Sequence, residues 1–301
     1  MDRITCTLPG GYADGDGTFH VEAELAPLTG REEELLADRA QRPSVALVTT
    51  VLARCLARLG SLSPVSEEVA RSLLVADRQF LLLKLRAATF GERVEATLSC
   101  PWPGCGENVD VDFSLDAVPV RESADKGPAY RLELPPEAAY HGAEGEEHRE
   151  VVFRLPNGGD QERIAPLAAA NEARALTLLL ERCVLAIGPL RDPGPEAIER
   201  LSPAARAAIE RRMEEVAPQV ALTMDVSCPE CGRAFEMPFD LQDFFFGELR
   251  TSRDLLYREV HYLAYHYHWS ESEILGLPRD KRRGYIEVLA DEIERLNHAI
   301  A

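Results

Sequence analysis

The sequence predicts an α+β protein that is mostly helical and that contains a zinc ribbon built from two distant β-hairpins. The first observation is two cysteine pairs, Cys100 with Cys105 and Cys228 with Cys231, each between two short stretches of strand character. The second is the helical apolar periodicity of much of the remaining chain, including its C-terminal section. With 301 residues, 46% of them hydrophobic, the chain can bury a sizeable core.

The four cysteines are candidate metal ligands because of their spacing and their turn residues. In Cys100-Pro-Trp-Pro-Gly-Cys105-Gly and Cys228-Pro-Glu-Cys231-Gly, proline and glycine predict tight turns that aim two sulfurs at one point. Structural Zn²⁺ takes four such ligands in a tetrahedron, and a closed site leaves no position for a substrate. The alternatives are hairpins with unliganded thiols or with disulfides. No signal peptide is recognisable, so we expect a reducing, cytoplasmic location, which disfavours disulfides.

Composition restricts the class of partner. The chain carries 51 acidic and 33 basic residues, a formal net charge of −18. Nucleic-acid binding needs a concentrated basic face, and the one compact basic cluster is Arg279, Lys281, Arg282 and Arg283. We interpret this cluster as the solvated first turn of a helix. No apolar run is long enough to span a bilayer. We therefore expect neither nucleic acid, nor a membrane, nor a small-molecule substrate as partner.

Residues 1–93 are predicted to form an N-terminal hairpin and helical region. Residues 4–28 alternate as strands around the turn residues 14–17, which lack the remaining ligands of a calcium loop. Apolar stripes predict helices over 44–59 and 66–88, the second buried on nearly every side at its centre. The charges of Asp77, Arg78 and Arg86 flank that centre, and we expect them to pair within it.

Residues 94–239 are predicted to hold the two ribbon hairpins and a long mixed insert over 114–219. The predicted ribbon strands are 94–98, 109–113, 220–226 and 234–239. The proline-rich and acidic stretch 114–150 predicts a surface excursion or linker. The insert is expected to continue with a strand at 151–155, a helix start capped by Asp160, and helices over 171–186 and 203–216, the last capped by Ser202.

Residues 240–301 are predicted to form a C-terminal helical segment. Asp240 is expected to cap a long helix, Ser270 and Glu273 form a capping box for a short one, and a final helix covers 279–299. This segment is rich in aromatic residues. The candidates for partner contact are Tyr262, Tyr265, Trp269 and Tyr285. The alternative is that the aromatic side chains pack the three helices together, and both roles can coexist.

The sequence favours a protein without catalytic activity. His261, His266 and His268 lie close together, but no HExxH pattern accompanies them. The chain has neither a GxSxG nucleophile turn nor a phosphate-binding loop, and Cys6, Cys55 and Cys183 lie in apolar contexts. Two alternative functions remain open. One is a zinc-ribbon regulator or nucleic-acid-binding protein, and the other is a histidine-based metalloenzyme.

Several short motifs resemble those of the T4-type phage baseplate hub assembly proteins, found in contractile tailed phages and related contractile injection systems. They are residues 12–17, 28–33, 74–78 with 85–91, 153–156 with 158–160, and the two Cys-Pro turns followed by Phe239-Asp240. The closing residues 267–285 resemble a small helical segment seen beside such tail proteins. The resemblance covers most of the chain outside roughly 114–150 and 187–218.

The resemblance implies a non-catalytic assembly factor or minor structural component of the baseplate hub. Its expected partners are baseplate hub or spike proteins of a contractile tail. Its expected location is the cytoplasm, with possible incorporation into the phage or injection-system particle. Not all members of the family carry the cysteines, so the structural zinc at Cys100, Cys105, Cys228 and Cys231 rests on the spacing in this sequence alone.

Overall fold

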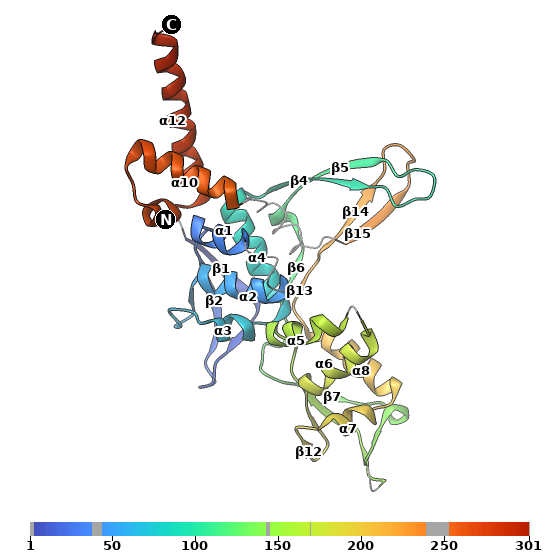
Figure 1. Ribbon diagram of the computed structural model, residues 1–301. Helices are drawn as coiled ribbons and strands as arrows, with labels where there is room; N and C mark the ends of the chain where they lie inside the picture. The colour runs from blue at the N-terminus through green and yellow to red at the C-terminus, as the bar shows by residue number, and fades with distance from the viewer. Residues whose placement is uncertain (1–2, 38–43, 143–144, 169, 239–252, 301) are drawn as a thin grey trace.

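The computed structural model describes residues 3–37, 44–142, 145–168, 170–238 and 253–300. Helices and small antiparallel sheets alternate along the chain, which confirms the predicted α+β class. Separate hydrophobic clusters occupy an N-terminal body, a second body, an arm and a C-terminal helical unit (Figure 1). In the described ranges, no helix is long and apolar enough to cross a membrane.

The N-terminal body packs helices against a three-stranded sheet of order β1-β2-β3. Its elements are β1 (Ile4–Ala13), β2 (Phe19–Leu25), α1 (Gly30–Ala37), α2 (Ser44–Cys55), β3 (Leu56–Leu59), α3 (Glu67–Ser72) and α4 (Val75–Phe90). The predicted hairpin at 4–28 is confirmed by the pairing of β1 with β2. Leu81, Leu82 and Leu85 of α4 are fully buried, as the apolar centre of this helix predicted.

One helix predicted in this body ends early and the other is interrupted, because tertiary pairing competes with helix propensity. The helix predicted over 44–59 ends at Cys55, and the next four residues form β3, which pairs with β2. The helix predicted over 66–88 is interrupted at Leu73 and Leu74, both extended. The Leu73 carbonyl accepts from Gly158 N–H at 3.1 Å, and Val75 N–H donates to the Pro156 carbonyl at 3.3 Å. The interruption thus joins this body to the second one.

The expected pairing among the charges of α4 is wrong for Asp77 and Arg78. The Asp77 carboxylate accepts from Gly10 N–H at 2.8 Å, which ties α4 to β1. The Arg78 guanidinium, 2% exposed, donates to Thr49 Oγ1 at 2.9 Å and to the Ala70 carbonyl at 2.8 Å. The hydrogen bonds of both buried groups therefore come from neighbouring elements, which a pattern within one helix does not reveal, and they leave Asp77 Oδ2 and Arg78 Nε without a partner.

The second body has a four-stranded sheet of order β12-β11-β10-β7 covered by helices. Its main elements are β7 (Tyr130–Glu133), β10 (Glu150–Phe153), α5 (Gly158–Ala168), α6 (Glu172–Cys183), β11 (Val184–Ile187), β12 (Leu190–Arg191), α7 (Pro195–Glu199) and α8 (Pro203–Val216). A 3₁₀ turn (Pro136–Ala138) and the short pair β8 (Tyr140–His141) with β9 (Glu147–His148) complete it. The Ser202 cap of α8 is confirmed, since its side chain accepts from Ala205 N–H.

Three predictions for this body are wrong in detail. The stretch 114–150 is not simply a surface linker, because β7 pairs with β10 and Tyr130 and Leu134 are buried in the core. The helix predicted over 171–186 ends at Cys183 because β11 then joins the sheet. Asp160 lies inside the first turn of α5 rather than before it. It is fully buried and pairs with Arg154 and Arg182, both at 2.6 Å.

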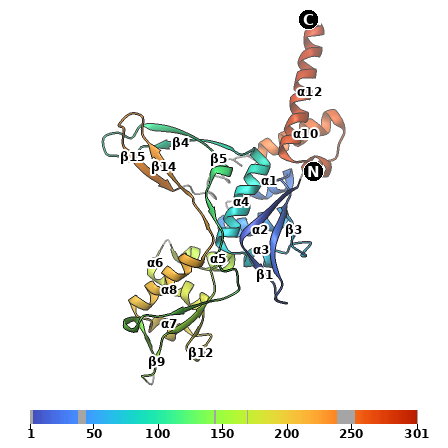
Figure 2. The ribbon, with the colours of Figure 1, turned by 180° about the vertical axis from the view of Figure 1, so that it is seen from behind.

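The arm, residues 93–114 and 223–238, consists of two antiparallel hairpins that extend away from both bodies (Figures 1 and 2). The first pairs β4 (Arg93–Ser99) with β5 (Asn108–Ser114), and the second pairs β14 (Thr223–Ser227) with β15 (Ala234–Pro238). The 3₁₀ turn Leu115–Ala117 and the pair β6 (Val120–Arg121) with β13 (Gln219–Val220) lie at its base. The two predicted hairpins are thus confirmed, although β13 is separate from β14.

The C-terminal helical unit, residues 253–300, contains α10 (Arg253–Tyr267), α11 (Glu271–Leu275) and α12 (Arg279–Ile300). The capping box of Ser270 and Glu273 is confirmed. The expected cap at Asp240 and the following residues to 252 lie outside the described part of the chain. The outer part of α12 projects from the molecule and ends at the C-terminus (Figure 1).

The basic cluster at the start of α12 is not a solvated turn. Arg279 and Arg282 are 7% and 0% exposed, whereas Lys281 and Arg283 are exposed. Arg282 donates to Glu33 of α1 at 2.8 Å and to Glu259 of α10 at 2.7 Å. Two of the four cations therefore hold helices together and are not available to bind phosphate.

Candidate metal centre

The two cysteine turns are shaped by backbone hydrogen bonds and by glycine. Cys100 N–H donates to the Glu107 carbonyl at 2.9 Å, and Cys228 N–H donates to the Arg233 carbonyl at 3.1 Å. Gly106 and Gly232 follow the second cysteine of each pair with φ of +71° and +68°. These values favour glycine because a Cβ is strained there. Each turn therefore curls back so that its two sulfurs face the same point.

The four thiols converge at the end of the arm. Their Sγ atoms all lie within 4.8 Å of one another, with Cys100 to Cys231 at 3.8 Å and Cys105 to Cys228 at 3.7 Å. A tetrahedron with metal–sulfur bonds of about 2.3 Å has sulfur–sulfur edges of about 3.8 Å. The cysteines are therefore close enough to bind a metal ion. Residues more than 120 positions apart in sequence complete the site, as the spacing of the two half-sites predicted.

Backbone N–H groups near the Cys228 sulfur favour its anionic form. The pKa of Cys228 is lowered to about 7 because the N–H groups of Cys231 and Glu230 donate toward its sulfur. Burial acts in the opposite direction and raises the pKa of Cys100. A thiolate is the form that ligates metals, so metal binding at these cysteines would be coupled to the loss of thiol protons.

Packing around the cluster is slight. Cys100 and Cys228 are buried together with Val109, Val226 and Phe235, whereas Cys231 is exposed. Trp102 Nε1 donates to the Ala234 carbonyl at 3.2 Å and so links the two hairpins. The Arg233 guanidinium lies 5.6 Å from the centre of the Trp102 ring. These contacts hold the second hairpin against the first, but the apolar area that they bury is small.

The remaining cysteines do not belong to this cluster. Burial raises the pKa of Cys6 to about 11 and that of Cys183 to about 12. Burial also raises the pKa of Cys55, which packs in the N-terminal core. Thiols with raised pKa values stay protonated and react poorly, so these three residues serve packing.

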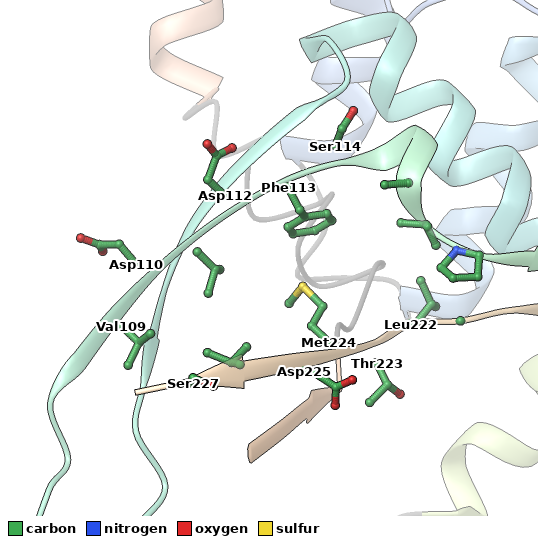
Figure 3. Close-up of a pocket in the computed structure, with 16 residues that line it drawn as sticks. Val109, Asp110, Asp112, Phe113, Ser114, Leu222, Thr223, Met224, Asp225 and Ser227 are labelled. Carbon is green, nitrogen blue, oxygen red and sulfur yellow. The ribbon is translucent and has the colours of Figure 1, made fainter. Parts of the chain in front are cut away.

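A groove of about 430 Å³ lies between β5 and β14 (Figure 3). In Figure 3, Phe113 and Met224 point toward each other across it, whereas Asp110 and Asp112 point away. Its lining combines apolar side chains with a strand edge on each side. The described residues that line it include no histidine, lysine or cysteine.

The candidate partner residues fall into two groups. Trp269 lies 4.9 Å from both Tyr267 and Tyr285, measured between ring centroids, so Trp269 and Tyr285 pack within the C-terminal helical unit. Tyr262 and Tyr265 lie on α10 beside His266, and Tyr265 is 70% exposed. The structure therefore brings the aromatic residues of the first group into intramolecular packing and leaves Tyr265 at the surface.

The histidines of this segment do not form a metal site. His268 follows the end of α10 with φ of +56°, and His261 stacks against Tyr265. Within the described ranges, the four cysteines are the group of metal-ligating side chains that converges. Glu33 is a buried carboxylate that no sequence motif marks as the partner of Arg279 and Arg282. The only local signal was two arginines, Arg279 and Arg282, on one face of a helix.

The fold and the cluster of Cys100, Cys105, Cys228 and Cys231 define an α+β protein with a four-cysteine arm. Residues 1–246 match the model of a family described as "T4 bacteriophage base plate protein". The chain belongs to this base plate family. Residues 249–301 match a family of unknown function (DUF6760). No curated protein and no solved structure matches significantly. Membership in a base plate family indicates a structural or assembly role in a phage baseplate, with other baseplate proteins as partners.

Proposed function

We propose that the protein is a non-catalytic assembly factor or minor structural component of the baseplate hub of a contractile tail or injection system. The observation that carries this proposal is the base plate family match over residues 1–246. The assignment to the hub rests on the short motifs described above, such as residues 12–17 and 153–160. The proposed partners are hub or spike proteins, and the proposed location is the cytoplasm before incorporation into the particle.

We propose further that Cys100, Cys105, Cys228 and Cys231 hold a structural zinc ion. Four converging thiols and the sulfur–sulfur distances near 3.8 Å support it. Zinc is preferred over harder divalent cations because thiolate ligands are soft. The ion would fix the relative position of the two hairpins. It would contribute folding energy rather than chemistry, since four protein ligands close the coordination shell.

The proposal divides the molecule by task. In this proposal residues 1–93 are the platform, residues 94–239 carry the zinc arm and its insert, and residues 240–301 are the C-terminal segment, whose described part contains α10, α11 and α12. The proposed partner surface includes Tyr262, Tyr265, Trp269 and Tyr285. Tyr265 supports it best because its ring is exposed. A regulator that binds nucleic acid is disfavoured, because Arg279 and Arg282 are buried in ion pairs and the chain carries a net charge of −18.

Fractionation of tagged protein from the host that makes it would test the baseplate role. Assembled particles are separated from soluble protein, and partners are identified in each fraction. Hub or spike proteins bound only in the soluble fraction would identify an assembly factor. Stoichiometric presence in particles would identify a structural component. The absence of tail proteins from both fractions would refute the proposal.

Metal analysis of protein purified without chelator would test the zinc assignment. The expected content is one zinc ion per chain. Less than half an equivalent, or a stoichiometric amount of another metal, would contradict the assignment without affecting the baseplate proposal.

A further inference from the structure

The groove between β5 and β14 lies at the junction of two hydrophobic cores. Phe113, Val118 and Leu222 line the groove and pack against the core of the N-terminal body. Val111 packs against the core of the arm, and Met224 packs against both cores. Apolar side chains placed in the groove would therefore make the two cores continuous, and their burial would be favourable.

The acidic residues of the groove walls do not change its apolar centre. Asp110, Asp112 and Asp225 are all exposed, and Figure 3 shows the first two pointing away from the groove. Asp110 accepts from Thr97 Oγ1 at 2.7 Å, and Asp112 pairs with Arg93. The groove thus fits an apolar segment rather than a charged one.

The chain itself continues from the groove wall into such a segment. β15 ends at Pro238, which pairs with Thr223 of the wall. Residues 239–252 lie outside the described part of the chain, and α10 begins at Arg253. The large apolar residues of this segment are Leu241, Phe244, Phe245, Phe246 and Leu249. Folded proteins rarely leave such a cluster of apolar side chains in water.

The far end of the segment also lies near the base of the arm. The Arg279 guanidinium of α12 lies 5.2 Å from the centre of the Phe90 ring, and β4 of the arm starts at Arg93. Figures 1 and 2 both show the start of α10 near this end of the arm. Residues 239–252 span roughly 46 Å at full extension, at about 3.3 Å per residue. The segment is therefore long enough to enter the groove and return.

Two further observations favour this segment as the occupant. The base plate family match continues past Pro238 to residue 246, so it includes the three phenylalanines together with the arm. In addition, the segment is covalently joined to described elements at both ends. Such a tether gives an effective concentration in the range of about millimolar, which favours this segment over a second copy or a separate protein.

We propose that residues 239–252 dock in the groove and bury Leu241, Phe244 and Phe245 between the arm and the N-terminal body. These positions are three and four residues apart, so one helical turn would present all three on the same face. The docked segment would fix the base of the arm, whereas the metal ion would fix its tip. The proposal goes beyond the baseplate role and does not depend on the metal ion.

Photo-crosslinking of the purified full-length chain tests the proposal. Benzoylphenylalanine takes the place of Phe245, and the crosslinked peptides are mapped by mass spectrometry. The expected product joins position 245 to residues 109–118 or 221–227 of the same chain. The same photoreactive residue at position 255 is the control. Leu255 is 51% exposed on α10. Its yield of crosslinks to the groove is expected to be at least about fivefold lower, because exposed side chains lack a fixed neighbour.

A mixture of chains with and without ¹⁵N distinguishes crosslinks within one chain from crosslinks between two. A product that joins labelled to unlabelled chains would assign the groove to a second copy and overturn the proposal. Crosslinks from position 245 only to the C-terminal helical unit, or no crosslink at all, would also overturn it.

Oxidation of methionine by hydrogen peroxide gives an independent measurement. Phe244→Ser with Phe245→Ser should speed the oxidation of Met224 at least about threefold, because the side chains that cover its sulfur are lost. Met213, which is 7% exposed in the core of the second body, should keep its rate. Phe19→Ser is the matched control, since Phe19 is 38% exposed on β2 and does not line the groove. Its effect on Met224 should be less than about twofold.

The two methionines separate uncovering of the groove from loss of the fold. An unchanged rate at Met224 in the double variant would overturn the proposal. Equal acceleration at Met213 would overturn it as well, because removal of a docked segment exposes the groove and leaves the second body folded.

Discussion

The arm and the C-terminal helical unit have similarly small cores that are held by different chemistry. Within the described residues, each core contains five buried hydrophobic residues. In the arm, two of the five are Cys100 and Cys228, which belong to the four-cysteine cluster. In the C-terminal unit, Glu33 and Glu259 bind Arg282 beside the core.

The difference teaches how a small unit is stabilised without a large core. Burial of so few side chains does not by itself offset the conformational entropy of ordering the backbone. Hairpins at the end of an arm have few neighbouring elements, so side chains that bind the same metal ion are an effective link between the hairpins. Helices that pack side by side can enclose a buried ion pair, provided that every charge has a partner. The N-terminal body has a much larger hydrophobic core.

The largest effect is expected from Cys228→Ser. Loss of one thiolate should lower metal affinity more than about 100-fold and unfold the arm, because metal binding and folding are coupled. Competition with a chromophoric chelator measures the affinity, and hydrogen exchange over residues 93–114 and 223–238 measures the order of the arm. Cys6→Ser is the matched control, since Cys6 lies outside the cluster. If metal affinity and hydrogen-exchange protection are unchanged in Cys228→Ser, a metal ion does not stabilise the arm.

Glu33→Gln should break the buried ion pairs that join α1 to the C-terminal unit. It leaves Arg279 and Arg282 buried beside a neutral side chain and should reduce stability by about 3 to 5 kcal/mol. Urea unfolding measures this change, and hydrogen exchange locates it in α10 and α12. Glu292→Gln is the control, because its partner Arg295 is exposed and such pairs contribute at most about 1 kcal/mol. Equal effects of the two substitutions would show that burial of the ion pair has no role.

In the N-terminal body, the buried carboxyl group of Asp77 accepts a hydrogen bond from the backbone N–H of Gly10. Burial raises its pKa to about 7. The folded state therefore holds the proton more tightly than the unfolded state, whose pKa is near 4. This contribution to stability is complete below about pH 4 and is lost as the pH rises through 7.

Asp77→Asn should remove this pH dependence while keeping an oxygen acceptor for Gly10 N–H. Between pH 5 and pH 8, wild type should lose about 2 to 3 kcal/mol relative to the variant. Urea unfolding of both proteins at the two pH values gives the difference directly, because other titrating groups are common to both. Parallel pH profiles would show that Asp77 does not titrate in this range.

The smallest expected changes in stability distinguish the aromatic residues that pack within the C-terminal unit from those that are exposed for contact with a partner. Trp269→Ala should reduce stability by about 2 kcal/mol because it removes ring contacts with Tyr267 and Tyr285. Tyr265→Ala should change stability by less than about 0.5 kcal/mol because the side chain is 70% exposed. Thermal unfolding measures both. A large loss of stability in Tyr265→Ala would assign this ring to packing as well.

Local patterns predicted the parts of the structure that depend on few neighbours. The cysteine turns, the capping box of Ser270 and Glu273, and the Ser202 cap are correct because each is specified within five or six residues. The hairpin at 4–28 and the final helix from 279 are correct because their apolar periodicity is strong. The convergence of the two cysteine pairs was also predicted, from ligand chemistry rather than from chain geometry.

The sequence by itself determined which local elements could form and which four thiols could share a metal ion. The tertiary structure decided where those elements end and which charges are buried. The residues after Cys55 became β3 because β2 offered hydrogen bonds, and the helix predicted over 66–88 broke because Leu73 and Val75 bond to the segment at 156–158. Arg282 became an internal link because Glu33, 249 residues away, lies beside it. Such contacts depend on the position of the whole chain, and no local pattern contains that information.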